Sequence, residues 1–181
     1  MKKILLLWLC CIPCLIFAEN REKDNLSIEK GKVVWQKIFT TPYNMEKTKA
    51  LLLTHVAAEE IKEFDNKIVF SCNKFHFNYQ DAGFGRAKAP LYYQNMIGSA
   101  FVTIDFKEGK YRVTVRNIVL EEFKVEALTP SYHSHISSHY LEEFVLKKKN
   151  SAFKAKFYKY DDPILNTTFA KMFQLIDDSK W

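Results

Sequence analysis

Hydrophobic and polar residues alternate along several separate stretches of the chain, as they do in half-buried β-strands. The alternation runs through residues 32–40 (KVVWQKIFT), 74–80 (KFHFNYQ) and 98–106 (GSAFVTIDF). Successive side chains of a strand point to opposite faces of a sheet, so one face of each strand is expected to be buried. A further strand is predicted in the apolar run KIVFSC, residues 67–72. In residues 32–40 both faces carry apolar side chains, so the pattern does not say which face is inner.

A β-hairpin is predicted after the third of these stretches. The turn Lys107–Lys110 contains Gly109 at a place where a positive φ is needed, and glycine adopts it without strain. The returning strand would cover residues 111–123 (YRVTVRNIVLEEF). Its two faces alternate as Tyr111, Val113 and Val115 against Arg112, Thr114 and Arg116.

Two segments have the spacing of helices. The segment from Met45 to Phe64 contains no Gly or Pro, and Asn44 before it is a favourable N-cap. Its apolar residues share one broad helical face: Met45, Leu52, Leu53, Val56, Ala57 and Phe64. A closing helix is predicted to begin at Asp161-Asp162-Pro163, because proline is favourable in a first helical turn. Its apolar stripe consists of Leu165, Phe169, Met172, Phe173 and Ile176.

The order of these elements predicts an α+β fold. An antiparallel sheet of about five strands would carry an N-terminal-side helix and a C-terminal helix on one face, in the order β-α-β-β-β-β-α. Residues 31–181 would form this single domain, with an irregular insertion at about 124–160. Residues 19–30 are charged and aperiodic, and are expected to be a disordered tail.

The chain begins with the pattern of a secretory signal peptide. Lys2 and Lys3 precede an apolar run that ends at Phe17, and Ala18 then precedes the polar segment ENREKDN. The apolar run is shorter than the roughly 20 residues that a membrane-spanning helix needs. Cleavage near Ala18 is therefore expected. It would export the protein to the periplasm or the outer cell envelope, with no transmembrane helix in the mature chain.

Cleavage would change the cysteine count and the charge. Three of the 4 cysteines lie in the leader, and none follows the small residue that lipoprotein processing needs, so lipidation is the weaker alternative. Cys72 would be the one remaining thiol, which excludes an intramolecular disulfide. It stands in an apolar run and is expected to be buried. The net charge would fall by two from +6, which is too mild for a typical nucleic-acid-binding protein.

The segment YHSHISSH, residues 132–139, holds three of the five histidines. In a strand His133 and His135 would share a face, whereas in a helix His135 and His139 would do so. A catalytic zinc needs three protein ligands and an open position. The segment leaves two hypotheses open: a metal site formed by His133, His135 and His139, or a solvated loop.

Lysines and aromatic residues are interleaved between residues 147 and 160. Such mixtures bind nucleic acid or anionic lipid, and an anionic envelope glycolipid suits an exported protein better. The alternative is an ordinary solvated face. The residues proposed to contact an anionic surface are Lys147, Lys148, Lys149, Lys154 and Lys156. The adjacent acidic pairs 59–60, 121–122 and 142–143 are expected at the surface, because neighbouring residues do not face each other.

Four stretches carry a resemblance to a known family: VVWQKIF, IVFSC, GFGRAKAP and FVTIDFKEGKYRVTVRNI. The segment from Val33 to Phe123 resembles a family of exported Bacteroidetes domains of unknown function, with a fold like one repeat of the TATA-box-binding protein. The closing segment DPILNTTFAKMFQLIDD lies where that family has a helix. The chain departs from the family in residues 86–88, where smaller residues are usual, and in about 124–160. The resemblance implies the fold and no catalytic residue, and likeness to a DNA-bending protein does not imply DNA binding.

Taken together, these patterns predict a non-enzymatic exported protein of the cell envelope. It would act without a cofactor as a binding or assembly module, through a sheet face or through residues 124–160. The partner would be an envelope protein or a glycolipid, not a nucleic acid. Two alternatives stay open: a metal-dependent hydrolase that uses His133, His135 and His139, and a carrier that holds an apolar small ligand between helix and sheet.

Overall fold

The computed structural model of the 181-residue chain describes residues 25–122 and 137–175. Within these residues the strands form one antiparallel sheet in the order β1-β2-β6-β5-β4-β3, and β7 pairs with the far end of β6. The strands are β1 (Leu26–Glu29), β2 (Lys32–Thr40), β3 (Ala58–Phe64), β4 (Lys67–Phe75), β5 (Met96–Lys107), β6 (Lys110–Glu122) and β7 (Ser138–Tyr140). The helices are α1 (Met45–His55), α2 (Leu91–Asn95), α3 (Leu141–Val145) and α4 (Phe157–Phe173), with a 3₁₀ turn at Lys148–Asn150.

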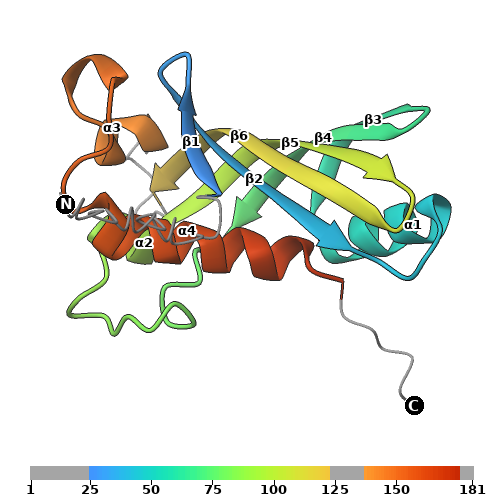
Figure 1. The fold of residues 1–181 in the computed structure, drawn as a ribbon. Helices are drawn as coiled ribbons and strands as arrows, with labels where there is room; N and C mark the ends of the chain where they lie inside the picture. The colour runs from blue at the N-terminus through green and yellow to red at the C-terminus, as the bar shows by residue number, and fades with distance from the viewer. Residues whose placement is uncertain (1–24, 123–136, 176–181) are drawn as a thin grey trace, which may run out of the picture.

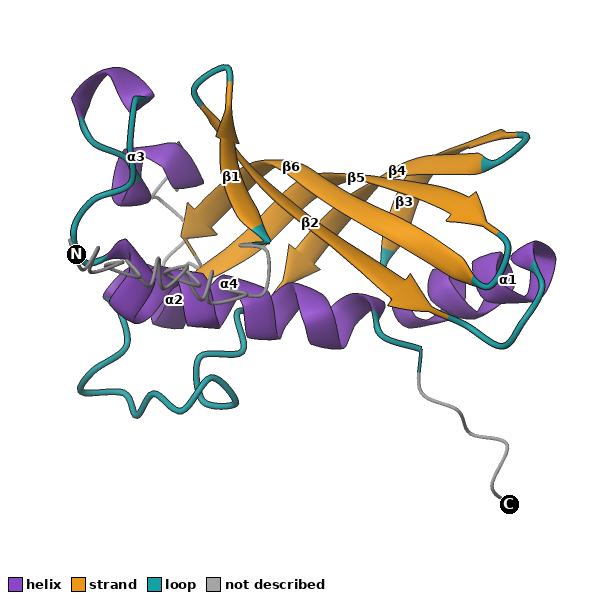
Figure 2. Cartoon of the chain, viewed as in Figure 1, coloured by secondary structure: helices purple, strands orange, loops and turns teal. Residues whose placement is uncertain are grey.

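The long helix α4 runs along one face of the sheet, and α1 lies beside its C-terminal end (Figures 1 and 2). The predicted α+β class and antiparallel sheet are confirmed. The predicted count of about five strands is too low, because the described residues contain seven.

The aromatic residues of α4 fill the space between helix and sheet. Trp35 of β2 packs against Phe169 and Phe173, with ring centroids 5.4 and 6.3 Å apart. Its indole nitrogen also donates to Asn166 Oδ1 at 2.8 Å. Trp35 and both phenylalanines are fully buried. Side chains of the protein thus occupy the region where the ligand-carrier hypothesis would place an apolar ligand.

The first hairpin lies where a disordered tail was expected. Residues 26–29 form β1, which pairs with residues 32–35 of β2. Lys30 and Gly31 join the two strands with φ values of 49° and 76°, the pair of positive angles that a type I′ turn requires. The tail prediction is therefore wrong for residues 26–30. The apolar positions of β1 are too few to stand out among its charged neighbours.

The predicted helix Met45–Phe64 is correct only in its first half. Asn44 caps α1 as expected, since its Oδ1 accepts a hydrogen bond from the Lys47 amide at 2.9 Å. After His55 the chain turns into β3, which pairs with β4 across the turn Asp65–Asn66. Pairing with a neighbouring strand overrides a helix preference that is weak by comparison.

Two predicted strands, 67–72 and 74–80, are in fact one strand and a loop. Strand β4 continues to Phe75, and the chain then leaves the sheet. Phe77 is nevertheless buried and lies 4.7 Å from the ring of Tyr93 in α2, a helix that the sequence did not predict. The alternation in residues 74–80 therefore does not indicate a strand. It reflects aromatic side chains that pack into the core and hold a loop against it.

The hairpin of β5 and β6 is confirmed. Lys107 pairs with Lys110, and Gly109 in the turn has a φ of 66°. Alternate residues of both strands are buried on the covered face: Ala100, Val102, Ile104, Phe106, Tyr111, Val113 and Val115.

Part of the predicted insertion is regular structure. Within residues 137–160 the chain forms β7 and α3, and α4 begins at Phe157, not at Asp161. Glu142 of α3 is 3% exposed, and its Oε1 accepts the Val33 amide hydrogen bond at 2.9 Å. The surface position expected for Glu142 is wrong, because the β2–β6 pairing ends at Trp35 and leaves Val33 in need of an acceptor.

Candidate functional site

The face of the sheet opposite α4 carries no helix among the described residues (Figure 2). Near the β3–β4 and β5–β6 turns, one line of side chains crosses five strands on this open face. Each member is the registered partner of the next across the sheet. We call it the cross-strand row; it consists of Ile38 (β2), Arg112 (β6), Asp105 (β5), Lys67 (β4) and Phe64 (β3).

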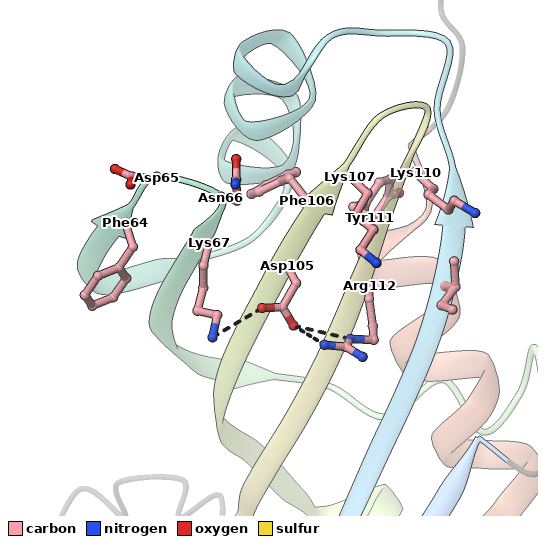
Figure 3. Close-up of a pocket in the computed structure, with 11 residues that line it drawn as sticks. Phe64, Asp65, Asn66, Lys67, Asp105, Phe106, Lys107, Lys110, Tyr111 and Arg112 are labelled. Carbon is pink, nitrogen blue, oxygen red and sulfur yellow. Dashed lines mark hydrogen bonds and ion pairs between the residues drawn. The ribbon is translucent and has the colours of Figure 1, made fainter.

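The centre of the row is an ion triad (Figure 3). Asp105 accepts hydrogen bonds from Arg112 Nη2 at 2.9 Å and Nε at 3.3 Å, and its other oxygen lies 3.3 Å from Lys67 Nζ. Burial alone would raise the pKa of Asp105. The hydrogen bonds from Arg112 and Lys67 outweigh it and hold that pKa below its usual value. Asp105 is therefore a fixed anion between two cations at neutral pH.

Both ends of the row are apolar and exposed. Ile38 is 61% exposed and Phe64 is 60% exposed. Between them lies a groove with a volume of about 630 Å³. The groove thus has an exposed apolar side chain at each end and charged side chains between them.

The groove carries more positive than negative charge. Its cations are Lys67, Lys107, Lys110 and Arg112, and its anions are Asp65 and Asp105. Lys107 and Lys110 stand opposite each other in the hairpin, and neither forms an ion pair with a residue that the structure describes. The lining therefore carries four positive and two negative side chains, and Glu108 stands between the two lysines in the turn.

Farther along the open face, two pairs of polar side chains satisfy each other. Arg116 pairs with Glu29 at 2.8 Å, and Asn73 donates to Glu59 at 2.7 Å. The same face also carries Lys62 of β3, which stands opposite Val69.

The structure describes only one of the three histidines in the predicted cluster. His133 and His135 lie outside the described residues. His139 is the middle residue of β7, and its Nδ1 lies 3.1 Å from Glu143 Oε2. The hydrogen bonds from His139 and from the Tyr140 amide hold the pKa of Glu143 below its usual value. In residues 25–122 and 137–175 no three metal-ligating side chains gather, so the metal hypothesis stays a prediction.

The five lysines of the predicted anionic-surface contact have different environments in the structure. Lys154 donates from Nζ to the backbone carbonyls of Glu143 and Phe144, at 2.9 and 2.6 Å, and so caps the end of α3. This role holds its ammonium group in place within the protein. The other four lysines are exposed: Lys147, Lys148, Lys149 and Lys156.

Cys72 lies in the core, as expected. It is 2% exposed, and burial raises the pKa of its thiol to about 11. The thiol therefore stays protonated at neutral pH and is a poor nucleophile.

The sequence indicated a binding face of the sheet but not the groove. Hairpin register alone would have placed Asp105 beside Arg112, since both face away from the buried residues of β5 and β6. The sequence does not predict Lys67 and Phe64 as neighbours of this pair, because its pattern places Phe64 in a helix.

Comparisons with known proteins give similarity in fold only. No family model matches the chain, and no curated protein matches it. One similar solved structure is a DUF4468 family protein from Bacteroides ovatus, at 15% identity and a TM-score of 0.47, covering 85% of this chain and 93% of that one. Another is a TBP-like protein from Parabacteroides distasonis, at 13% identity and a TM-score of 0.43, covering 81% and 94%.

Both similar structures come from Bacteroidetes, and neither description names a ligand, a partner or a reaction. The resemblance predicted from the sequence is confirmed in kind: the structural neighbours are a family of unknown function and a TBP-like protein.

Proposed function

We propose that this protein is an exported, non-enzymatic binding module of the cell envelope that docks its partner on the open sheet face. The observation that carries the proposal is the cross-strand row. Ile38 and Phe64 keep about three-fifths of their surface in water at either side of an ion triad. Burying such side chains against a partner would release roughly 25 cal/mol for each Å² of apolar surface.

Export is supported by the leader pattern of residues 1–18, which lie outside the described part of the chain. None of the described helices has the length and apolar character needed to cross a membrane.

A non-catalytic role is supported by the chemistry of the groove. A general acid or base works best when its pKa lies near the working pH. Asp105, which lies at the centre of the groove, has its pKa held low by two cations. Such a carboxylate orients charged neighbours and is unsuited to proton transfer at neutral pH.

Site-specific photo-crosslinking in the native envelope tests this proposal. A photoreactive amino acid is placed at Ile38 or at Phe64 on the open face. Matched controls carry it at Leu91 of α2 or at Tyr158 of α4, which are 70% and 62% exposed and lie outside the row. Crosslinks to the same envelope component from Ile38 and Phe64, but not from the controls, are expected. Equal crosslinking from the controls, or none from the row, would overturn the proposal.

A further inference from the structure

The charge and dimensions of the groove indicate which kind of molecule could bind in it. Resting on the proposed function, we infer that the groove takes an acidic, extended peptide segment of a partner protein. This segment lies across the strands, with an apolar side chain at each end and carboxylates between them. The inference stands on the described residues that line the groove and on their register in the sheet.

Charge is the first argument. The groove lining holds four cations and two anions, and Lys107 and Lys110 are the two without a described acidic partner. Their side chains rise from the hairpin at the edge of the row (Figure 3). Carboxylates of a bound segment would complete the alternation of charge that Lys67, Asp105 and Arg112 begin.

Length is the second argument. Ile38 and Phe64 lie on strands separated by three others, because the order is β2-β6-β5-β4-β3. Neighbouring strands are about 4.8 Å apart, so the apolar ends of the row are roughly 19 Å apart. An extended chain rises about 3.3 Å per residue, and about six residues therefore span the row.

Asp105 favours a peptide over an anionic membrane surface. It stands in the middle of the row, 25% exposed, and would repel a continuous layer of phosphate groups. A peptide places carboxylates at the cations and offers backbone N–H groups to Asp105. A groove also receives a narrow chain more readily than a flat layer of lipid headgroups.

The test is an NMR titration of ¹⁵N-labelled mature protein with a capped peptide, Leu-Thr-Glu-Gly-Glu-Thr-Leu, and with its Glu-to-Gln counterpart. The acidic peptide is expected to shift the amide signals of Phe64, Lys67, Asp105 and Arg112, and to leave Lys147 and Lys148 unshifted. The Gln peptide is expected to bind at least about threefold more weakly, as the loss of exposed ion pairs implies.

A pair of variants tests which lysines attract the acidic peptide. The double variant Lys107→Gln/Lys110→Gln is expected to weaken binding of the acidic peptide by about three- to tenfold. It leaves folding intact, because it removes two like charges that stand opposite each other. The matched control is Lys147→Gln/Lys148→Gln, on the exposed 3₁₀ turn and its flank, and is expected to change nothing.

Four outcomes contradict the inference. They are equal binding of the Gln peptide, a loss of binding confined to the Lys147/Lys148 variant, no binding of either peptide, and binding of phosphatidylglycerol vesicles without binding of the acidic peptide. Crosslinks from Ile38 and Phe64 that persist alongside any of these results would retain the proposed surface and reject only its acidic occupant. Absence of those crosslinks would reject the surface itself.

Discussion

Two aspartates, one on each side of the sheet, have opposite environments. Asp161 belongs to α4 on the covered side; it is 5% exposed and accepts a hydrogen bond from the Tyr92 hydroxyl. Burial raises its pKa, and the hydrogen bond from Tyr92 opposes this only in part. Asp105 lies on the open face, where hydrogen bonds from Arg112 and Lys67 bring its pKa below the usual value.

The difference shows what each side of the sheet contributes. The covered side obtains its stability from apolar packing and tolerates a carboxylate at a cost. The open face contributes little to folding, since its ion triad is exposed and such pairs stabilise proteins weakly. Ile38 and Phe64 on that face are exposed and lie outside the core.

The largest expected effect is on the covered side. Phe169→Ala removes a fully buried ring that lies 5.4 Å from Trp35 and 5.7 Å from Phe75. Loss of the ring and the resulting cavity should lower the free energy of unfolding by about 3–5 kcal/mol. Urea denaturation followed by tryptophan fluorescence measures it. A loss below about 1 kcal/mol would contradict the description of this interface.

The next effect concerns Asp161. Its pKa is raised in the folded state, so the folded protein binds the proton more tightly and loses stability as pH rises from the ordinary aspartate pKa through the folded one. Asp161→Asn keeps an acceptor for Tyr92 and should remove this pH-dependent loss of stability. Unfolding free energies of both proteins between about pH 3 and 7 give the comparison. An unchanged pH slope would contradict the environment described for Asp161.

Asp105→Asn should have a smaller effect of opposite sign. The pKa of Asp105 is lowered, so its contribution is present above the ordinary aspartate pKa and is lost as pH falls through the folded one. The variant should lose less than about 1 kcal/mol at pH 7, and less again in high salt. The same titration of stability against pH checks this. A loss of several kcal/mol would mean that the triad is structural.

The smallest effect on stability is expected at the apolar ends of the row. The double variant Ile38→Ser/Phe64→Ser should change the free energy of unfolding by no more than about 0.5 kcal/mol for each site. It should nevertheless abolish shifts at Lys67 and Arg112 in the peptide titration. Leu91→Ser/Tyr158→Ser is the matched control, with similar exposure outside the row. If the Ile38/Phe64 variant still bound the peptide, these two side chains would not contribute to binding in the groove.

How much of this could be predicted from sequence depends on how local each feature is. The β5–β6 hairpin was predicted correctly because its turn and its alternation lie within one continuous segment. The second half of the predicted helix 45–64 became β3, because its pairing with β4 outweighs local propensity. Helix α4 begins at Phe157, four residues before the predicted start, and the burial of Asp161 against Tyr92 depends on α2, which is distant in the sequence.

The groove could not be predicted from the sequence, because its residues are distant from one another along the chain. Its five row residues come from five strands and meet only through the register of the whole sheet. Lysine runs and histidine clusters are conspicuous in sequence because their members are neighbours. A site assembled across a sheet shows no such run.

Hydrogen–deuterium exchange of the mature protein, alone and with envelope membranes and proteins from its host, tests the central claim most directly. Docking on the open face should slow exchange in the turns Asp65–Asn66 and Glu108–Gly109, which border the groove, and should leave exchange in residues 147–156 unchanged. Protection confined to residues 147–156, or protection nowhere, would contradict docking on the open face.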